Sequence, residues 1–209
     1  MILIGQYDSP FVRRVGIALR LYGLPFEHRP WSTFGDADQI AQFNPLCRVP
    51  TLVLDNGEVV IESGAILDHL DEMAGPSRAM IARGGERRRQ ALKISALATG
   101  LADKAVSLVY ENVLHRTVSD QWAERCRTQI LAALNALEAD RATRATRFWA
   151  GNAIGHADIA VGCALRFVCD AHAGLFDPRR WPALASHLAT CEQLPVFQEI
   201  AQPFDPPRR

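Results

Sequence analysis

The sequence predicts two folded parts, an α/β amino-terminal domain over residues 1–76 and an all-helical domain over residues 86–209, with a linker over residues 77–85. Short apolar runs typical of strands alternate with helical patterns up to residue 73, and no strand pattern follows Gly75-Pro76. The charge changes at the same place: the first 76 residues carry a net charge of −5 and the remainder +5. Both observations indicate two domains of different character.

The first strand is expected in the apolar run ILIGQY at residues 2–7. A helix follows from Pro10, with apolar residues at helical spacing, and Gly23 and Pro25 end it. The segment PFEHRP is the candidate second strand. Because a helix connects the two strands, they are predicted to pair in parallel.

The next elements are a short helix in GDADQIAQF and two apolar runs, TLVL and EVVI, separated by Asp55–Gly57. Two such runs around a turn predict an antiparallel hairpin. Ser63 is expected to cap the following helix. The core face of that helix is predicted to hold Ile66, Leu67, Leu70 and Met73. The predicted order is β-α-β-α-β-β-α, with a mixed four-stranded sheet.

Only helices are predicted in the second domain. One long helix has its core face at Leu97, Leu101, Ala105, Leu108 and Val109, and the next at Trp122, Cys126, Ile130, Ala133, Leu134 and Leu137. Residues 157–169 are apolar nearly all round, which predicts a buried central helix with Gly155 as its cap and Asp158 three residues later. Helices in WPALASHLATCEQL and PVFQEIA follow, and the tail PFDPPRR is expected to be loose.

Composition removes several classes of function. No apolar stretch approaches the roughly 18 residues of a membrane span and no signal peptide precedes the fold, so we expect a cytoplasmic protein without a membrane partner. The three arginines at 87–89 are read as a solvated helix start, so no nucleic acid partner is expected. Five scattered cysteines without a C-x-x-C pair argue against disulfides and zinc, and only Cys47 is open for reactivity. The six histidines, His156 included, show no ligand spacing, so no metal is assigned.

Four blocks carry a resemblance over nearly the whole chain: SPFVRRV (9–15), FNPLCRVPTL (43–52), ESGAILDHL (62–70) and GHADIAVG (155–162). In this order and spacing they resemble a cytosolic glutathione transferase, and the first block most resembles the bacterial serine-type members. The resemblance implies a thioredoxin-like first domain and a homodimer. It also implies detoxification chemistry with glutathione as co-substrate and a small electrophile as the other reactant.

A glutathione site is implied at two of these blocks. From the residues alone, Val49-Pro50 is as consistent with a trans turn as with a cis bond. The resemblance implies cis, with the Val49 backbone pairing with the cysteinyl backbone of glutathione. The helix start at Glu62-Ser63 suits a carboxylate, and the resemblance assigns Glu62 to the γ-glutamyl ammonium and Ser63 to its carboxylate. Plain capping remains compatible with this assignment. Arg48 is a candidate for the glycyl carboxylate, although an exposed arginine alone favours solvent.

Ser9 is the predicted catalytic residue and Tyr7 its rival. Ser before Pro is a standard helix cap, but a hydroxyl donor at a helix start also stabilises a thiolate. The resemblance therefore implies that Ser9 stabilises the glutathione thiolate. Other branches of the family use a Tyr near the end of the first strand, which keeps Tyr7 as the alternative.

The electrophile pocket is predicted by position, with candidates at Phe11, Val12, Val106 and Tyr110. Apolar residues at helical spacing are also typical of a core, so that alternative stays open. Asp103 is either a surface acid or, as in some relatives, a group that reaches a partner subunit's glutathione. The leading hypothesis is an enzyme that conjugates glutathione to small electrophiles, or uses it as a cofactor in an isomerisation or dehalogenation. The alternative is a transferase-like binding or regulatory protein with little catalysis.

Overall fold

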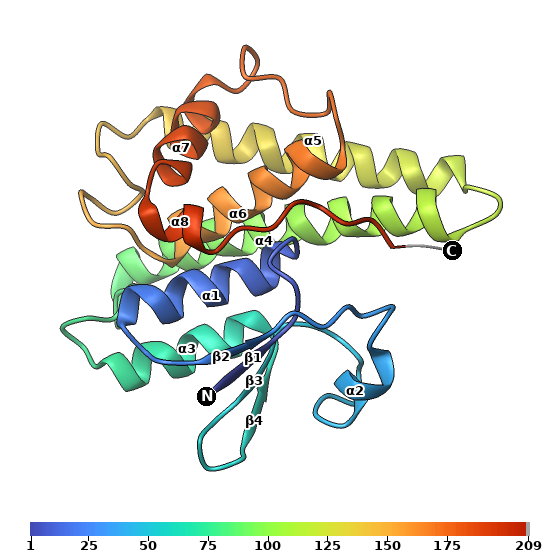
Figure 1. Cartoon of the computed structure of the whole chain (residues 1–209). Helices are drawn as coiled ribbons and strands as arrows, with labels where there is room; N and C mark the ends of the chain where they lie inside the picture. Colours follow the sequence, from blue (N-terminus) through green and yellow to red (C-terminus); the bar gives the residue numbers. More distant parts are fainter. Residues whose placement is uncertain (208–209) are drawn as a thin grey trace.

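A four-stranded mixed sheet organises the first part of the chain (Figure 1). The structure, a computed structural model, describes residues 1–207. The strands lie in the order β2-β1-β3-β4. Strand β1 pairs in parallel with β2 and β3 pairs antiparallel with β4, both as predicted, and β1 also pairs antiparallel with β3. Their bounds are β1 Ile2–Ile4, β2 Glu27–Arg29, β3 Thr51–Val53 and β4 Val59–Ile61.

Strand β1 is shorter than the predicted run because Gly5 ends it. Gly5 has φ +127°, a backbone conformation that favours glycine. A β-carbon there would lie 2.5 Å from Cγ2 of Val12 and 2.8 Å from Cβ of Val49. Strand β1 therefore ends at Gly5, where Val12 of helix α1 and Val49 of the loop before Pro50 come closest to its backbone.

Three helices accompany the sheet: α1 (Pro10–Tyr22), the short α2 (Ala37–Ala41) and α3 (Ser63–Ala74). Helices α1 and α3 pack side by side, and their apolar faces bury a core with Leu3 and Leu52 of the sheet. The order β-α-β-α-β-β-α and the thioredoxin-like architecture are thus confirmed.

The second part of the chain is helical, also as predicted. It contains α4 (Gly85–Leu114), α5 (Asp120–Ala142), α6 (His156–Ala171), α7 (Pro182–Glu192) and α8 (Pro195–Glu199). Helix α6 is buried along nearly its whole length and packs on α4, α7 and α1 (Figure 1). Gly155 is its cap residue, and the Gly155 N–H donates to Asp158 Oδ2 at 2.9 Å. No helix among residues 1–207 has the length and apolarity that a bilayer crossing requires.

A buried polar cluster connects the two parts. Asp71 of α3 accepts a hydrogen bond from the Tyr22 hydroxyl, and its Oδ1 lies 3.0 Å from Nε2 of His156. The Met80 N–H donates to the Tyr22 hydroxyl oxygen at 2.9 Å and to Asp71 Oδ1 at 3.0 Å. His156 lies in the first turn of α6, as expected, and this cluster fixes α6 relative to α1 and α3. The exact domain boundaries at residues 76 and 86 stay a prediction.

Two predicted core residues are wrong. Met73 is 49% exposed in the last turn of α3, where Asp71 takes the buried position because Tyr22 and His156 bind it. Trp122 is 38% exposed in the first turn of α5, and the Lys104 ammonium lies 5.7 Å from its ring centroid. Both residues lie in terminal turns of their helices. There the neighbouring elements no longer cover the helix face that the spacing of apolar residues predicts to be buried.

Ser63 does not cap α3, contrary to the prediction. Glu62 holds the cap position with φ +66°, Ser63 is the first helical residue, and no side chain provides a cap hydrogen bond. The first turn of α3 therefore keeps backbone donors that no side chain satisfies.

Candidate functional site

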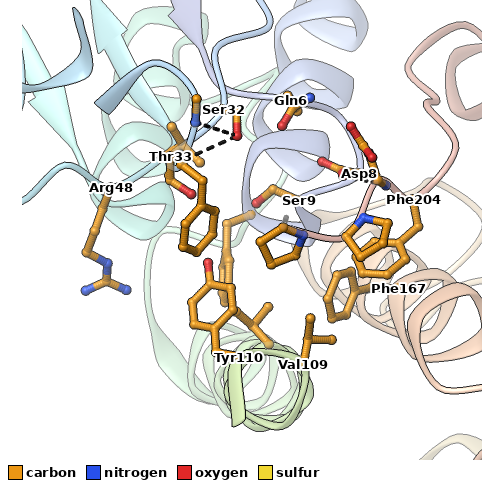
Figure 2. Close-up of a pocket in the computed structure, with 18 of the residues that line it drawn as sticks. Gln6, Asp8, Ser9, Ser32, Thr33, Arg48, Val109, Tyr110, Phe167 and Phe204 are labelled. Atoms are coloured by element: carbon orange, nitrogen blue, oxygen red, sulfur yellow. Dashed lines mark hydrogen bonds between the residues drawn. The ribbon is translucent and has the colours of Figure 1, made fainter. Parts of the chain in front are cut away.

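A cavity of about 780 Å³ lies between the loop that precedes α1 and helix α4 (Figure 2). Figure 2 shows Ser9 near its centre, Arg48 on one side and Phe167 with Phe204 on the opposite side. Apart from Phe167, the lining residues come from within four segments, 6–11 without Tyr7, 31–35, 47–49 and 103–110, and from the end of the described chain, residues 204–207.

Ser9 both caps α1 and faces this cavity. The Val12 N–H donates to Ser9 Oγ at 3.4 Å, which uses a lone pair of the hydroxyl. No hydrogen bond joins the hydroxyl hydrogen to an acceptor within residues 1–207. The hydroxyl can therefore donate into the cavity while it caps the helix.

Tyr7 lies elsewhere. Its ring stacks on His28 with centroids 3.9 Å apart, and it lines a smaller cavity of about 290 Å³ rather than the larger one. Burial raises the pKa of Tyr7 to about 12. The two rival residues are thus separated into different cavities.

The Val49-Pro50 peptide bond is cis, as the resemblance implied. Val49 lines the cavity, and its backbone N–H and C=O make no hydrogen bond to any residue in the described range. The Arg48 carbonyl accepts hydrogen bonds from Asn44 Nδ2 at 2.9 Å and from Thr51 Oγ1 at 3.1 Å. This loop is held in place while both backbone groups of Val49 stay free for an extended peptide.

The start of α3 lies beside the cavity rather than in its lining. Glu62 and Ser63 do not line it, but Arg48, which does, forms an ion pair with Glu62 at 3.2 Å. Ser63 is 5% exposed and Glu62 is open to solvent. The Arg48–Glu62 ion pair therefore connects the cavity wall to the start of α3, where Ser63 is nearly fully buried.

Three of the four predicted electrophile contacts line the cavity: Phe11, Val106 and Tyr110. The prediction for Val12 is wrong, because Val12 is fully buried against the sheet, where its Cγ2 lies over Gly5. The Tyr110 ring meets Phe34 edge-on with centroids 5.3 Å apart. Burial raises the pKa of Tyr110. Asp103 also lines the cavity and forms an ion pair with Lys104 at 2.9 Å.

The carboxy-terminal segment was expected to be loose, and residues 203–207 contradict this; residues 208 and 209 lie outside the described range. The Phe204 ring packs edge-on against Phe167 with centroids 5.5 Å apart. The Asp205 N–H donates to Asp8 Oδ2 at 3.1 Å, and the Tyr7 N–H donates to Gln202 Oε1 at 3.1 Å. One signal was available: a lone aromatic residue among prolines, whose fixed φ restricts the chain.

Two other features complete the site. The loop Ser32–Gly35, which the sequence did not mark, lines the cavity, and Ser32 Oγ accepts from the Phe34 N–H at 3.2 Å. Cys47 lines it as well, with φ +50° and a free thiol. Within residues 1–207 no group of three or more His, Cys, Asp or Glu side chains is arranged to hold a metal.

Three comparisons with known proteins bear on the family. Residues 3–78 match the glutathione S-transferase N-terminal domain, and residues 120–190 match the C-terminal domain. The chain is 32% identical over 171 residues to the uncharacterized GST-like protein YibF of Escherichia coli (strain K12), covering 80% of this chain and 82% of YibF. A glutathione S-transferase from Methylobacterium radiotolerans JCM 2831, solved with glutathione sulfonate, is 27% identical with a TM-score of 0.88 over 98% of this chain and 97% of its own. One from Methylobacillus flagellatus KT, solved with GSH bound, is 25% identical with a TM-score of 0.87 over 97% of this chain and 99% of its own.

Proposed function

Because this chain belongs to the glutathione S-transferase family, we propose that it is a serine-type glutathione transferase in which Ser9 stabilises the thiolate of glutathione. The observation that carries the proposal is the Ser9 hydroxyl, which has a free donor, lies at the start of a 13-residue helix and faces the large cavity. The electrophile would be small and mostly apolar, since Phe11, Val106 and Tyr110 line the same cavity.

The chemistry follows from the position of that hydroxyl. A thiol has a pKa near 8.5, and a hydrogen-bond donor with a helix dipole behind it lowers this value. A shift of about two units corresponds to about 2.7 kcal/mol of preferential stabilisation of the thiolate. The thiol proton leaves to solvent, the sulfur forms a carbon–sulfur bond, and the leaving group departs with its bonding pair. Ser9 donates throughout and does not become a nucleophile.

The free backbone of Val49 supports the binding half of the proposal. An extended tripeptide that pairs with Val49 like an added strand would bring its cysteinyl sulfur into the cavity that Ser9 lines. Its γ-glutamyl ammonium would then face Glu62. One relative was solved with glutathione sulfonate and another with glutathione bound, which supports glutathione as the ligand of this site.

The first experiment separates the enzyme from a binding protein. Retention on immobilised glutathione and turnover of 1-chloro-2,4-dinitrobenzene are expected. Binding without turnover of any electrophile would favour the binding or regulatory alternative. No retention and no thermal shift in millimolar glutathione would refute the proposal as a whole.

The second experiment assigns the thiolate stabiliser. Ser9→Ala is expected to raise the thiol pKa of bound glutathione by one to two units, read from the thiolate absorbance during a pH titration. Tyr7→Phe is the matched control and should leave that pKa unchanged, because the Tyr7 ring lies in the other cavity. An effect of Tyr7→Phe with none of Ser9→Ala would reverse the assignment.

The proposal extends to the setting of the enzyme. We infer a homodimer with a detoxification role, as the resemblance implies, and a cytoplasmic protein without a resident metal, as the composition and the spacing of the cysteines and histidines indicate. Sizing chromatography with light scattering should give twice the mass of one chain.

A further inference from the structure

The carboxy-terminal segment, residues 200–207, is fixed at its start to helix α1. Arg13 of α1 is buried, and its Nε donates to the Ile200 carbonyl at 2.8 Å. Its Nη2 donates to the Phe197 carbonyl at 2.8 Å, and the two terminal nitrogens donate to the Glu192 carboxylate at 2.8 and 3.0 Å. The point at which the segment leaves α8 is therefore well defined.

Further along, the segment makes two hydrogen bonds to the turn at residues 6–9, which leads from β1 into α1. The Tyr7 N–H donates to Gln202 Oε1 at 3.1 Å, and the Asp205 N–H donates to Asp8 Oδ2 at 3.1 Å. Among the described residues, no other hydrogen bond connects this turn to a segment distant along the chain. The hydrogen bonds that hold the turn from outside therefore come from the carboxy-terminal segment.

The two hydrogen bonds differ in their exposure. The bond between Tyr7 and Gln202 is half-buried, whereas the bond between Asp205 and Asp8 is exposed to solvent. A hydrogen bond that is partly removed from water is electrostatically stronger, and loss of its acceptor leaves the N–H without a partner. Gln202 therefore constrains the turn more than Asp205 does.

Gln202 has no direct access to a ligand in the large cavity. Its side chain lines the smaller cavity, whereas Ser9 lines the large one. The Gln202 amide carries no charge, so it exerts no long-range electrostatic effect on a sulfur. The Tyr7 N–H that it binds lies two residues before Ser9 in the same turn. Any effect of Gln202 on the sulfur therefore passes through the position of Ser9.

We propose that Gln202 is a positioning residue for the thiolate of glutathione: by accepting from the Tyr7 N–H, it fixes the Ser9 hydroxyl where this hydroxyl donates to the sulfur. This inference rests on the proposed function. A donor must be held in place before the charge forms, because a hydrogen bond weakens steeply as its distance and angle depart from the optimum. The same segment carries Phe204 into the wall of the large cavity. The segment thereby fixes the thiolate donor and the aromatic wall relative to each other.

Gln202→Met tests the inference, because methionine keeps the length of the side chain and lacks the amide oxygen. The variant should raise the thiol pKa of bound glutathione by about 0.5 to 1 unit, since one hydrogen bond that orients the donor is lost. At about pH 6.5 this shift should lower kcat/KM for 1-chloro-2,4-dinitrobenzene about three- to tenfold. Gln198→Met is the matched control: Gln198 Nε2 donates to the Glu192 carbonyl at 3.2 Å and does not contact the turn. Its thiol pKa should equal that of wild type.

Two further measurements distinguish positioning of Ser9 from a general loss of structure. S-methylglutathione has no ionisable thiol, so Gln202→Met should bind it with the wild-type Kd. In a Ser9→Ala background, adding Gln202→Met should not raise the thiol pKa further, because the donor that Gln202 positions is already gone. This double-mutant cycle measures whether the two residues act as one unit.

The outcomes separate this inference from the proposed function. Equal thiol pKa values in wild type and Gln202→Met, together with a raised value in Ser9→Ala, would overturn the inference and leave the proposed function intact. Additive shifts in the double variant would also overturn it, because Gln202 would then act independently of Ser9. A weaker Kd for S-methylglutathione would overturn it as well, since the variant would then disturb the binding of the peptide itself. Absence of glutathione binding by wild type, or a wild-type thiol pKa in Ser9→Ala, would overturn the proposed function and this inference with it.

Discussion

Phe204→Ala tests whether the carboxy-terminal segment forms part of the electrophile site. The Phe204 ring lines the cavity and meets Phe167 edge-on at 5.5 Å, while the segment is also tied by the Asp205 N–H to Asp8. That backbone bond survives the substitution, so only the ring is lost. The edge-to-face geometry contributes about 1 kcal/mol beyond the area that the ring buries, and for a chain of this size this contribution alone lowers Tm by about 2–4 °C.

The same magnitude applies to an aromatic substrate that contacts the ring. Loss of about 1 kcal/mol from the transition state lowers kcat/KM for 1-chloro-2,4-dinitrobenzene about fivefold. Iodomethane is too small to depend on an aromatic wall, so its kcat/KM should change by less than about twofold in the same assay. The Kd for glutathione should not change.

The matched control is Phe176→Ala. Phe176 is also half-buried against the helical core, but it stacks on Trp181 with centroids 5.6 Å apart and does not line the cavity. It should lose a similar amount of stability and keep the wild-type ratio of the two activities. If Phe204→Ala leaves that ratio unchanged as well, the carboxy-terminal segment does not contribute to substrate selection and the reasoning is refuted.

Two further predictions concern the buried Asp71 cluster and the half-buried Cys47 thiol. Asp71→Asn should cost about 3 kcal/mol in urea unfolding near pH 7, because it removes one partner of a buried pair. Burial alone would raise the pKa of Asp71, but hydrogen bonds from His156 and Tyr22 hold it below its ordinary value. The ionised form of Asp71 therefore stabilises the fold above about pH 4, and this contribution is lost as the pH falls. A difference in the free energy of unfolding between wild type and Asp71→Asn that stays constant down to pH 3 would contradict this prediction. Separately, saturating S-methylglutathione should slow the modification of Cys47 by iodoacetamide several-fold, because Cys47 lines the cavity. Peptide mass spectrometry measures this rate. Cys169 lies outside the cavity lining and is the control, which should react equally with and without S-methylglutathione.

Helix α1 illustrates what local sequence can determine. Ser9 and Pro10 mark its start and Gly23 its end, and the structure has the helix at Pro10–Tyr22 with those two cap residues. The signals work because they act within one turn of the chain. The cis bond before Pro50 was different, since it came from the resemblance and the residues alone left it open.

The errors arose where one part of the chain covers another. Phe11 and Val12 are adjacent apolar residues on one helix, and only packing against the sheet decides that Val12 is buried while Phe11 lines the cavity. Phe204 could not be assigned to the site because its contact with Phe167 joins segments that no local pattern connects. Nothing in the sequence distinguishes Arg13, whose guanidinium donates to Glu192, from Arg14, whose Nε is buried without a hydrogen-bond partner.

The starts of α1 and α3 differ in their chemistry, and under the proposed function they would bind the cysteinyl and the γ-glutamyl parts of glutathione, respectively. At α1, Ser9 satisfies a backbone donor and keeps one hydrogen free, which suits a soft thiolate that needs one directional donor. At α3, no side chain accepts a hydrogen bond from the backbone N–H groups of the first turn, and the buried guanidinium of Arg14 lies beside that turn. This arrangement suits a hard carboxylate, which accepts several donors. A Ser cap at α3 would compete with a carboxylate for the same N–H groups, so the uncapped start favours ligand binding at the expense of the free protein's stability. Ser9→Ala is therefore expected to weaken the helix cap of α1 and, under the proposed function, to destabilise the glutathione thiolate as well.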